Sequence, residues 1–436
     1  MVDLKSALGV LSKSSPYAVS TIREELNHEL HPFKDYLYIK TDIQKKFEET
    51  ASNVSGKDII FLCGSSGDGK SELLTRYKKT HTDEFLFHLD GTHSFSPNET
   101  AIQALDKRFS EFKSSDKPLI IGINTGMLGN YLADGLDEHQ DIKESIDAFL
   151  KGQIVNQNHH FIDFSNLSIL AEGNKSFTLK LIEKLTDPVE TNPYYKLFLA
   201  ESNSLTAPSL LHTNYRLLSH HSVQKQIENL LKKVRLQFDQ FITARAVLDF
   251  VYELLSDKQY LFDVLFEDSE NELLRYMSQF DPAQVHSYEL DQFKLQFNLK
   301  LLKPSYQTFV DQSMKWGIDG FNSGDSVLRF MLLMQNDDGV SSEIKYLIAQ
   351  ASQSVVMDYV KTWFLHKTYS DDASNRQSLN TFYREVVISA IHRYCNRHGQ
   401  EFVKGQYFLY ELNGYKVACD LEIKADFSAI PVNKPN

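Results

Sequence analysis

One stretch of the chain combines glycines, a lysine and a serine at a spacing that suits phosphate binding. Residues 64–71 read GSSGDGKS and match the pattern G-x-x-x-x-G-K-[ST]. Backbone N–H groups around Gly67 and Gly69 can converge on phosphate oxygens, because glycine permits the required backbone angles. Lys70 would reach the β- and γ-phosphates, and the Ser71 hydroxyl would ligate Mg²⁺. A merely flexible glycine turn does not explain the Lys-Ser pair, so the pattern predicts a Walker A loop for ATP or GTP phosphates.

Hydrolysis also needs a carboxylate at the end of an apolar strand, where it can hold the Mg²⁺ shell. Asp90 ends the apolar run 85–90 and is the favoured candidate, and Asp163, in the run FIDF, is an alternative. Asn124 ends the run 119–124 and resembles the strand-tip residue that orients the attacking water in AAA+-type ATPases. For each of these side chains, a structural role in a turn or helix cap is the competing interpretation. The predicted catalytic residues are Lys70, Asp90 and Asn124, and the predicted metal ligands are Ser71 and Asp90.

An arginine from a distant part of the chain could complete the site. Arg245 begins an apolar helix in the run ITARAVL and resembles the lid-helix arginine of AAA+ proteins, which touches the γ-phosphate. Arg216 is a rival, and a surface position is the competing interpretation for both. A positioned arginine can stabilise the charge of a transferring phosphoryl group, but spacing alone does not show that it does. The residues expected to bind the nucleotide are Gly64, Ser65, Ser66, Gly67, Asp68, Gly69, Lys70, Ser71, Glu72 and Arg245.

The pattern around the glycine-rich run predicts a parallel sheet. Residues 57–63 are a short apolar run bounded by turn residues on both sides, which is typical of a buried parallel strand. A helix follows from Lys70, and further strands are expected at 85–90, 119–124 and 160–164, with helical segments between them. This alternation indicates an α/β fold with helices on both faces of the sheet. We therefore expect an AAA+-like P-loop NTPase core.

After about residue 175 the pattern changes, and long amphipathic stretches predict helices. The last predicted elements are a helix over 379–398 and a hairpin with strands 407–411 and 415–419. The turn Asn413-Gly414 suits a hairpin because both residues tolerate positive φ. The expected divisions are an N-terminal helical segment 1–55, a P-loop core 56–175, a helical lid 176–300 and a mostly helical C-terminal domain 301–436 that ends in the hairpin.

The composition argues against several classes of protein. The chain has 436 residues and a net charge of −12, so it lacks the basic footprint of a stand-alone DNA-binding protein. It contains no apolar run of the roughly 20 residues that a membrane helix needs. Its first residues lack the apolar region of a secretory signal, which favours a cytoplasmic protein. Its three cysteines lie far apart and show no metal-binding spacing.

Four segments together resemble the F component of DNA-phosphorothioation-dependent restriction systems, the DptF (DndF) family. They read LSKSSPYAV, GSSGDGKSELL, FHLDGTHSFSP and LIIGINTGMLGNYL and lie within about the first 130 residues. The Walker A portion is generic, whereas the pieces HLD-[AG]-T-x-S and IN-x-G-x-L make the resemblance specific. Asp90 matches an acid in the third segment.

This resemblance implies a role in bacterial defence. Members of the family act with G and H partner subunits to restrict DNA that lacks the sulfur modification of its backbone, and the F component is regarded as a nucleoside triphosphatase. No nuclease motif stands out in the sequence, so cutting and most DNA contact would belong to partners, and oligomer formation is left open. Two other functions remain: a nucleotide-binding switch or scaffold with little hydrolysis, which the lack of an obvious catalytic glutamate suggests, and a small-molecule kinase, for which no general base stands out.

Overall fold

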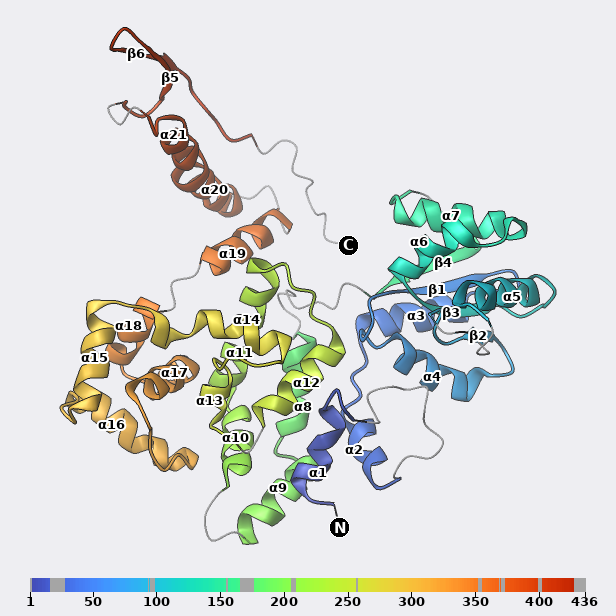
Figure 1. The fold of residues 1–436 in the computed structure, drawn as a ribbon, viewed down its shortest axis with the longest axis horizontal. Helices are drawn as coiled ribbons and strands as arrows, with labels where there is room; N and C mark the ends of the chain where they lie inside the picture. The colour runs from blue at the N-terminus through green and yellow to red at the C-terminus, as the bar shows by residue number, and fades with distance from the viewer. Residues whose placement is uncertain are drawn as a thin grey trace. The chain divides into compact units, whose positions relative to one another are not determined.

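The computed structural model divides the chain into two compact units, Met1–Ser352 and Gln353–Asn436 (Figure 1). The expected boundary at residue 300 lies inside the first unit. Parts of the resembling segments LSKSSPYAV and FHLDGTHSFSP lie outside the described residues. The structure describes residues 2–15, 28–92, 94, 99–153, 156–164, 176–204, 209–255, 258–351, 355–367, 369, 373–398 and 402–426.

The first unit contains a four-stranded parallel sheet, which confirms the α/β prediction. Its strands are β1 (Ile59–Gly64), β2 (Leu86–His88), β3 (Leu119–Asn124) and β4 (His159–Asp163), in the order β2-β3-β1-β4. Every residue of β1 is buried, as expected for a central strand covered on both faces. Strand β2 is shorter than the predicted run 85–90, because the chain turns after its third residue.

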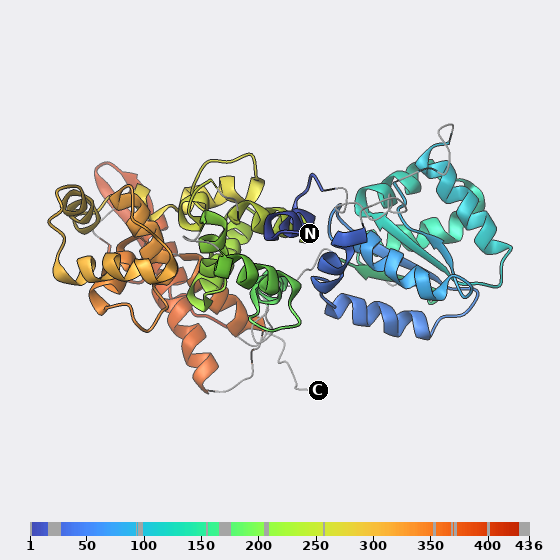
Figure 2. The same ribbon diagram turned by 90° about the horizontal axis from the view of Figure 1, so that it is seen from below.

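Alternate residues of the strands point to opposite faces, and each face has its own layer of helices. The face that carries Phe61 and Ile121 packs against α5 (Ala101–Lys113), α6 (Thr125–Asp134) and α7 (Gln140–Leu150). The other face packs against α3 (Asp42–Ser52) and α4 (Lys70–His81). Figure 2 shows the sheet between these two layers. The predicted double covering of the sheet is therefore confirmed.

The rest of the first unit is a helical body, residues 177–351. Its apolar core continues across residue 300 and also takes in α1 (Leu4–Leu8) and Leu37 near the N-terminus. The short helix α2 (His31–Tyr36) packs beside this core through Phe33, whose ring meets Tyr194 edge to face. The helices of the body are α8 (Phe177–Thr186), α9 (Pro193–Ser204), α10 (Leu210–Leu218), α11 (His221–Gln237), α12 (Ala244–Leu254), α13 (Leu261–Val264), α14 (Glu272–Met277), α15 (Tyr288–Asn298), α16 (Pro304–Gln312), α17 (Gly324–Met334) and α18 (Ser342–Ala351).

The second unit ends in the predicted hairpin, formed by β5 (Gln406–Leu412) and β6 (Tyr415–Asp420). Asn413 and Gly414 have φ values of 52° and 81°, as a tight hairpin turn requires. Asn396 fastens the hairpin to the preceding helix: its Nδ2 donates to Gln406 O, and its Oδ1 accepts from the N–H of Phe408. The helices of this unit are α19 (Val355–Lys367), α20 (Ala373–Phe382) and α21 (Ser389–Cys395), with a π-helical turn, Tyr383–Ile388, between the last two.

Candidate functional site

Residues Gly64–Ser71, the glycine-rich loop, connect the buried strand β1 to the first turn of α4. Gly64, Gly67 and Gly69 have φ values of 155°, 84° and 101°, a region that side-chain-bearing residues rarely adopt. A Cβ atom on Gly64 would lie 2.1 Å from an oxygen of Asp68 and 3.0 Å from Cβ of Phe164. The glycines are thus required by the backbone, and the loop delivers the chain directly to the N-terminal end of α4, where backbone N–H groups favour an anion.

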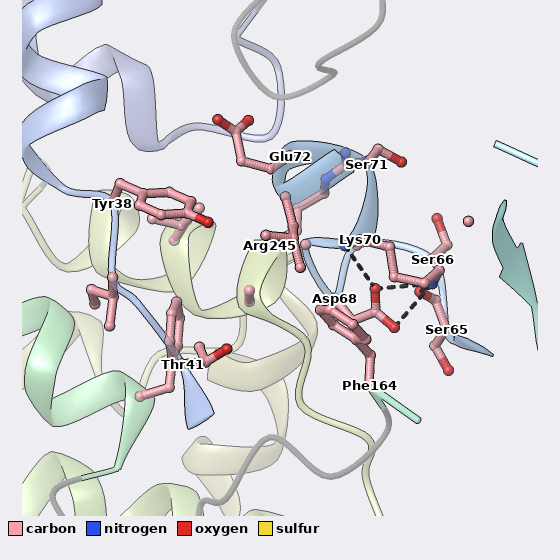
Figure 3. Close-up of a pocket in the computed structure, with 18 of the residues that line it drawn as sticks. Tyr38, Thr41, Ser65, Ser66, Asp68, Lys70, Ser71, Glu72, Phe164 and Arg245 are labelled. Carbon is pink, nitrogen blue, oxygen red and sulfur yellow. Dashed lines mark hydrogen bonds and ion pairs between the residues drawn. The ribbon is translucent and has the colours of Figure 1, made fainter. Parts of the chain in front are cut away.

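Lys70 and Asp68 form a buried ion pair inside this loop. Lys70 Nζ donates to Asp68 Oδ1 at 2.9 Å, to Asp68 Oδ2 at 3.0 Å and to Ser65 O at 2.7 Å (Figure 3). The two side chains are 7% and 1% exposed, so water screens the pair only weakly. Burial raises the pKa of Asp68 above its ordinary value, although the nearby Lys70 opposes the shift. The carboxylate is therefore strongly desolvated, and its charge depends on Lys70.

A cavity of about 570 Å³ opens beside the loop. Residues 65–73 line it, together with Asp90, Asn124 and Arg245. These three positions are far apart in the sequence, and each was predicted to contribute to the same site. Apart from Gly64, which ends β1, every residue of the predicted site lines this cavity.

Asp90 and Asn124 reach the cavity from the carboxyl ends of neighbouring strands. Asn124 ends β3, in register with Gly64, and begins α6 without a side-chain capping bond. Asp90 lies two residues beyond β2, where its Oδ1 accepts from the N–H of Thr92 at 3.0 Å and from the Thr92 hydroxyl at 2.6 Å. Because β3 separates β2 from β1, Asp90 is one strand farther from the loop than Asn124. Asp90 thus makes the contacts of a turn aspartate and also lines the cavity.

Asp163 and Arg216, the alternatives to Asp90 and Arg245, lie outside the cavity. Asp163 ends β4 on the opposite side of β1, in register with Cys63, and is exposed. Burial, with a smaller contribution from the charge of Asp163, raises the pKa of Cys63 above its ordinary range. Arg216 lies in α10. Among the residues that the structure describes, neither Asp163 nor Arg216 lines the cavity.

The helical body touches the glycine-rich loop through the start of α12. Thr243 caps this helix by accepting from the N–H of Ala246, and the N–H of Arg245 donates to Gly67 O at 3.0 Å. The approach is close, because a Cβ atom on Gly67 would lie 3.1 Å from Cβ of Arg245. The backbone contact fixes the position from which the Arg245 side chain lines the cavity (Figure 3).

The second side of the cavity was not predicted from the sequence. We call it the apolar wall, although Tyr38 and Thr41 from the N-terminal segment also contribute polar atoms (Figure 3). It carries no motif. Its members come from three segments, one before the strands of the sheet in the sequence and two after them, so no local pattern could have predicted it. The wall consists of Leu37, Tyr38, Ile39 and Thr41 with Phe177, Leu181 and Leu248.

Charged contacts tie the apolar wall to the helix that follows the loop. The guanidinium of Arg76 in α4 lies 4.1 Å from the centroid of the Tyr38 ring and donates to Glu72 at 2.8 Å and to Asp35 at 2.5 Å. Lys34 pairs with Glu72 at 3.0 Å. Burial raises the pKa of Tyr38 to about 12, so its phenol stays neutral at physiological pH. The N-terminal segment is thus coupled to the residue next to Ser71.

The metal chemistry of the site is simple. Within the described part of the chain, no group of three or more His, Cys, Asp or Glu side chains could hold a metal ion. The two predicted ligands, the hydroxyl of Ser71 and the carboxylate of Asp90, both line the cavity. Such a sparse set of oxygen donors fits Mg²⁺, which keeps several waters and commonly uses substrate phosphates as ligands. The residues present therefore fit an ion that arrives with a nucleotide.

Comparisons with known proteins found no match, either among family models, among curated proteins or among solved structures. The described helices include none long and apolar enough to span a bilayer. The interpretation of the cavity therefore depends on its own geometry and on the sequence patterns around it.

Proposed function

We propose that the chain binds ATP with Mg²⁺ through an AAA+-like P-loop core and hydrolyses it as a subunit of a DNA restriction complex. The observation that carries the proposal is the glycine-rich loop itself. The G-x-x-x-x-G-K-S sequence lies between a buried parallel strand and a helix, with its glycines at positive φ, and it faces a cavity with an apolar second side. This is the context in which the motif has chemical meaning.

The two sides of the cavity suit the two ends of a nucleotide. Phosphate groups fit the loop, because the N-terminal end of α4, the loop N–H groups and Lys70 all favour negative charge. The base fits the apolar wall, where Tyr38 offers an aromatic ring and Leu248 an aliphatic surface. The volume of about 570 Å³ falls within the range of about 300–1,000 Å³ common for small-molecule sites.

Each residue of the site has a separate role in the transfer of the phosphoryl group to water. Lys70 and the loop N–H groups hold the phosphates and stabilise charge that develops on them. Ser71 would ligate Mg²⁺ and Asp90 would support its water shell, and the ion when bound would supply positive charge to the phosphates. Asn124 orients the attacking water from the tip of β3. Arg245 brings a positive charge from the helical body to the cavity, where it would stabilise charge on the transferring phosphoryl group.

The restriction role comes from the resemblance of the first 130 or so residues to the DptF family. It assigns G and H subunits as partners and DNA as the target of the complex. The net charge of −12 supports DNA contact mainly through those partners. Genes for such partners beside this one, and for sulfur modification of DNA, would support the role.

Lys70→Ala tests the proposal. We expect ATP affinity to fall by about a hundredfold or more and turnover to vanish, since a buried charge-assisted contact to phosphate is lost. The matched control is Lys78→Ala, an exposed lysine near the other end of the same helix, which should leave binding unchanged. Fluorescent-nucleotide titration and phosphate release measure the two quantities, and thermal unfolding shows that both variants are folded. Equal ATP binding by Lys70→Ala and the wild type would refute the proposal.

One observation favours a second function, a nucleotide-binding switch with little hydrolysis. The carboxylate of Asp90 is engaged by Thr92, and the tip of β3 carries an amide in Asn124 rather than a second acid. Neither of these two strand-end positions therefore supplies an evident general base for the attacking water. Tight ATP binding with turnover no faster than that of Lys70→Ala, in the presence of partners and DNA, would select the switch.

A further inference from the structure

The carboxylate of Asp68 lies within the glycine-rich loop, in contact with Lys70 and next to Gly64. Both of its oxygens contact Lys70 Nζ, at 2.9 and 3.0 Å, and one accepts from the backbone N–H of Lys70 at 3.3 Å. A backbone hydrogen bond from Ser65 also stabilises the charged form. An ammonium group and convergent backbone N–H groups are the donors that a phosphate would use in this loop. The Asp68 carboxylate therefore already accepts hydrogen bonds from the groups that would bind a phosphate.

The position of this carboxylate is built into the loop. Asp68 stands between Gly67 and Gly69, both at positive φ, and its side chain is 1% exposed. One of its oxygens packs so close to Gly64 that a Cβ atom there would lie 2.1 Å away. The G-x-x-x-x-G-K-S pattern leaves the residue type at position 68 open. The surrounding glycines thus fix the position of the side chain at residue 68. The motif does not require that this side chain be an acid.

We propose that Asp68 is a built-in competitor anion that lowers the affinity of the loop for every phosphate ligand by a common factor. The inference depends on the proposed nucleotide function of the same site. A phosphate and a carboxylate cannot share Lys70 closely, because like charges at a few ångströms repel strongly where water is excluded. A ligand must therefore displace Asp68 from Lys70 before it can take the loop donors.

Because the factor is common, it leaves the order of the phosphate affinities unchanged but brings the weakest ligand, orthophosphate, below useful binding. Orthophosphate replaces the contacts of the carboxylate nearly one for one and gains little. Pyrophosphate and ATP carry further phosphate groups, which can contact the N-terminal end of α4 and share a Mg²⁺ ion with Ser71. These ligands therefore gain contacts beyond those that replace the Asp68 carboxylate. The loop consequently rejects orthophosphate, including the product of hydrolysis, and accepts chains of two or more phosphates.

The test uses Asp68→Asn in the full-length chain, which keeps the shape of the side chain and removes its charge. The probes are orthophosphate, pyrophosphate and ATP, each titrated by calorimetry with Mg²⁺. We expect all three affinities to rise by a similar factor of about ten or more, so that orthophosphate binding becomes measurable. The matched control is Asp83→Asn, which removes the same charge from an exposed aspartate just beyond α4 and should change none of them.

The outcomes separate the two proposals. If the wild type binds ATP and Asp68→Asn binds the three ligands equally tightly or more weakly, the competitor role is wrong and the nucleotide site stands. A gain confined to ATP would also overturn it, because simple competition affects every phosphate ligand alike. If neither protein binds ATP or pyrophosphate, both the nucleotide function and this inference fail. Asp68→Ala, checked for folding by thermal unfolding, should show the same common gain.

Discussion

The glycine-rich loop and the apolar wall face the same cavity, but they are assembled differently. The loop is one continuous run, residues 64–71, whose shape depends on its own glycines and on the strand and helix at its ends. The wall is gathered from residues 37–41 and from helices α8 and α12, which lie more than a hundred residues farther along the chain. One side of the cavity is a local structure, and the other exists only when distant segments pack.

This difference in assembly suits two different roles: the loop binds phosphates, and the wall binds the base. Phosphate binding needs donors fixed within a few tenths of an ångström, which a short loop between rigid elements can supply. The wall needs an apolar surface, and it is joined to α4 by the partly exposed ion pairs of Arg76 with Asp35 and Glu72. Changes in the loop should therefore affect all phosphate ligands, while changes in the wall should affect only ligands that carry a base.

Among the substitutions that compare the two sides of the cavity, Gly67→Val should have the largest effect. Gly67 has a φ of 84°, which costs roughly 1–2 kcal/mol for a residue with a side chain, and the new Cβ would lie 3.1 Å from Cβ of Arg245. We expect the affinities for both pyrophosphate and ATP to fall by about a hundredfold, or about 2.8 kcal/mol. Calorimetric titration measures both.

Gly152→Val is the matched control for this substitution. Gly152 also has positive φ, at 67°, but nothing lies within 4 Å of its Cβ position, so the variant carries backbone strain without any contact with the cavity. Its binding should equal that of the wild type. If Gly67→Val retained its pyrophosphate affinity, the loop would not be the phosphate site.

The strands and the loop could be predicted because their signals are local. Strand β3 occupies the predicted residues 119–124, and the turn at Asn413-Gly414 forms the expected hairpin. The end of β2 could not be predicted, because Leu89 continues the apolar pattern beyond the strand, while the side chain of Asp90 turns back to Thr92. The apolar wall could not be predicted either, since the contact of Arg76 with Tyr38 joins residues with no common period or motif.

Arg245→Ala should have a smaller effect, and on turnover rather than on affinity. The backbone bond from residue 245 to Gly67 O survives the substitution, so the loop keeps its shape. The lost guanidinium would otherwise stabilise charge in the transition state, and we expect turnover to fall about tenfold with ATP affinity nearly unchanged. Arg216→Ala, the rival arginine, should leave both unchanged. Phosphate-release kinetics compare the two, and a larger loss in Arg216→Ala would reverse the assignment.

Tyr38→Ala should have the smallest effect, and it tests the division of tasks most directly. The ring belongs to the wall, so its removal should weaken ATP binding by about fivefold, as expected for the loss of an aromatic contact of about 1 kcal/mol. The affinity for pyrophosphate, which has no base, should stay the same. Tyr346→Ala removes an exposed ring, 61% accessible, from α18 and serves as the control. Equal losses for both ligands would mean that Tyr38 supports the loop through Arg76 rather than the base, and the two sides of the cavity would then act as one.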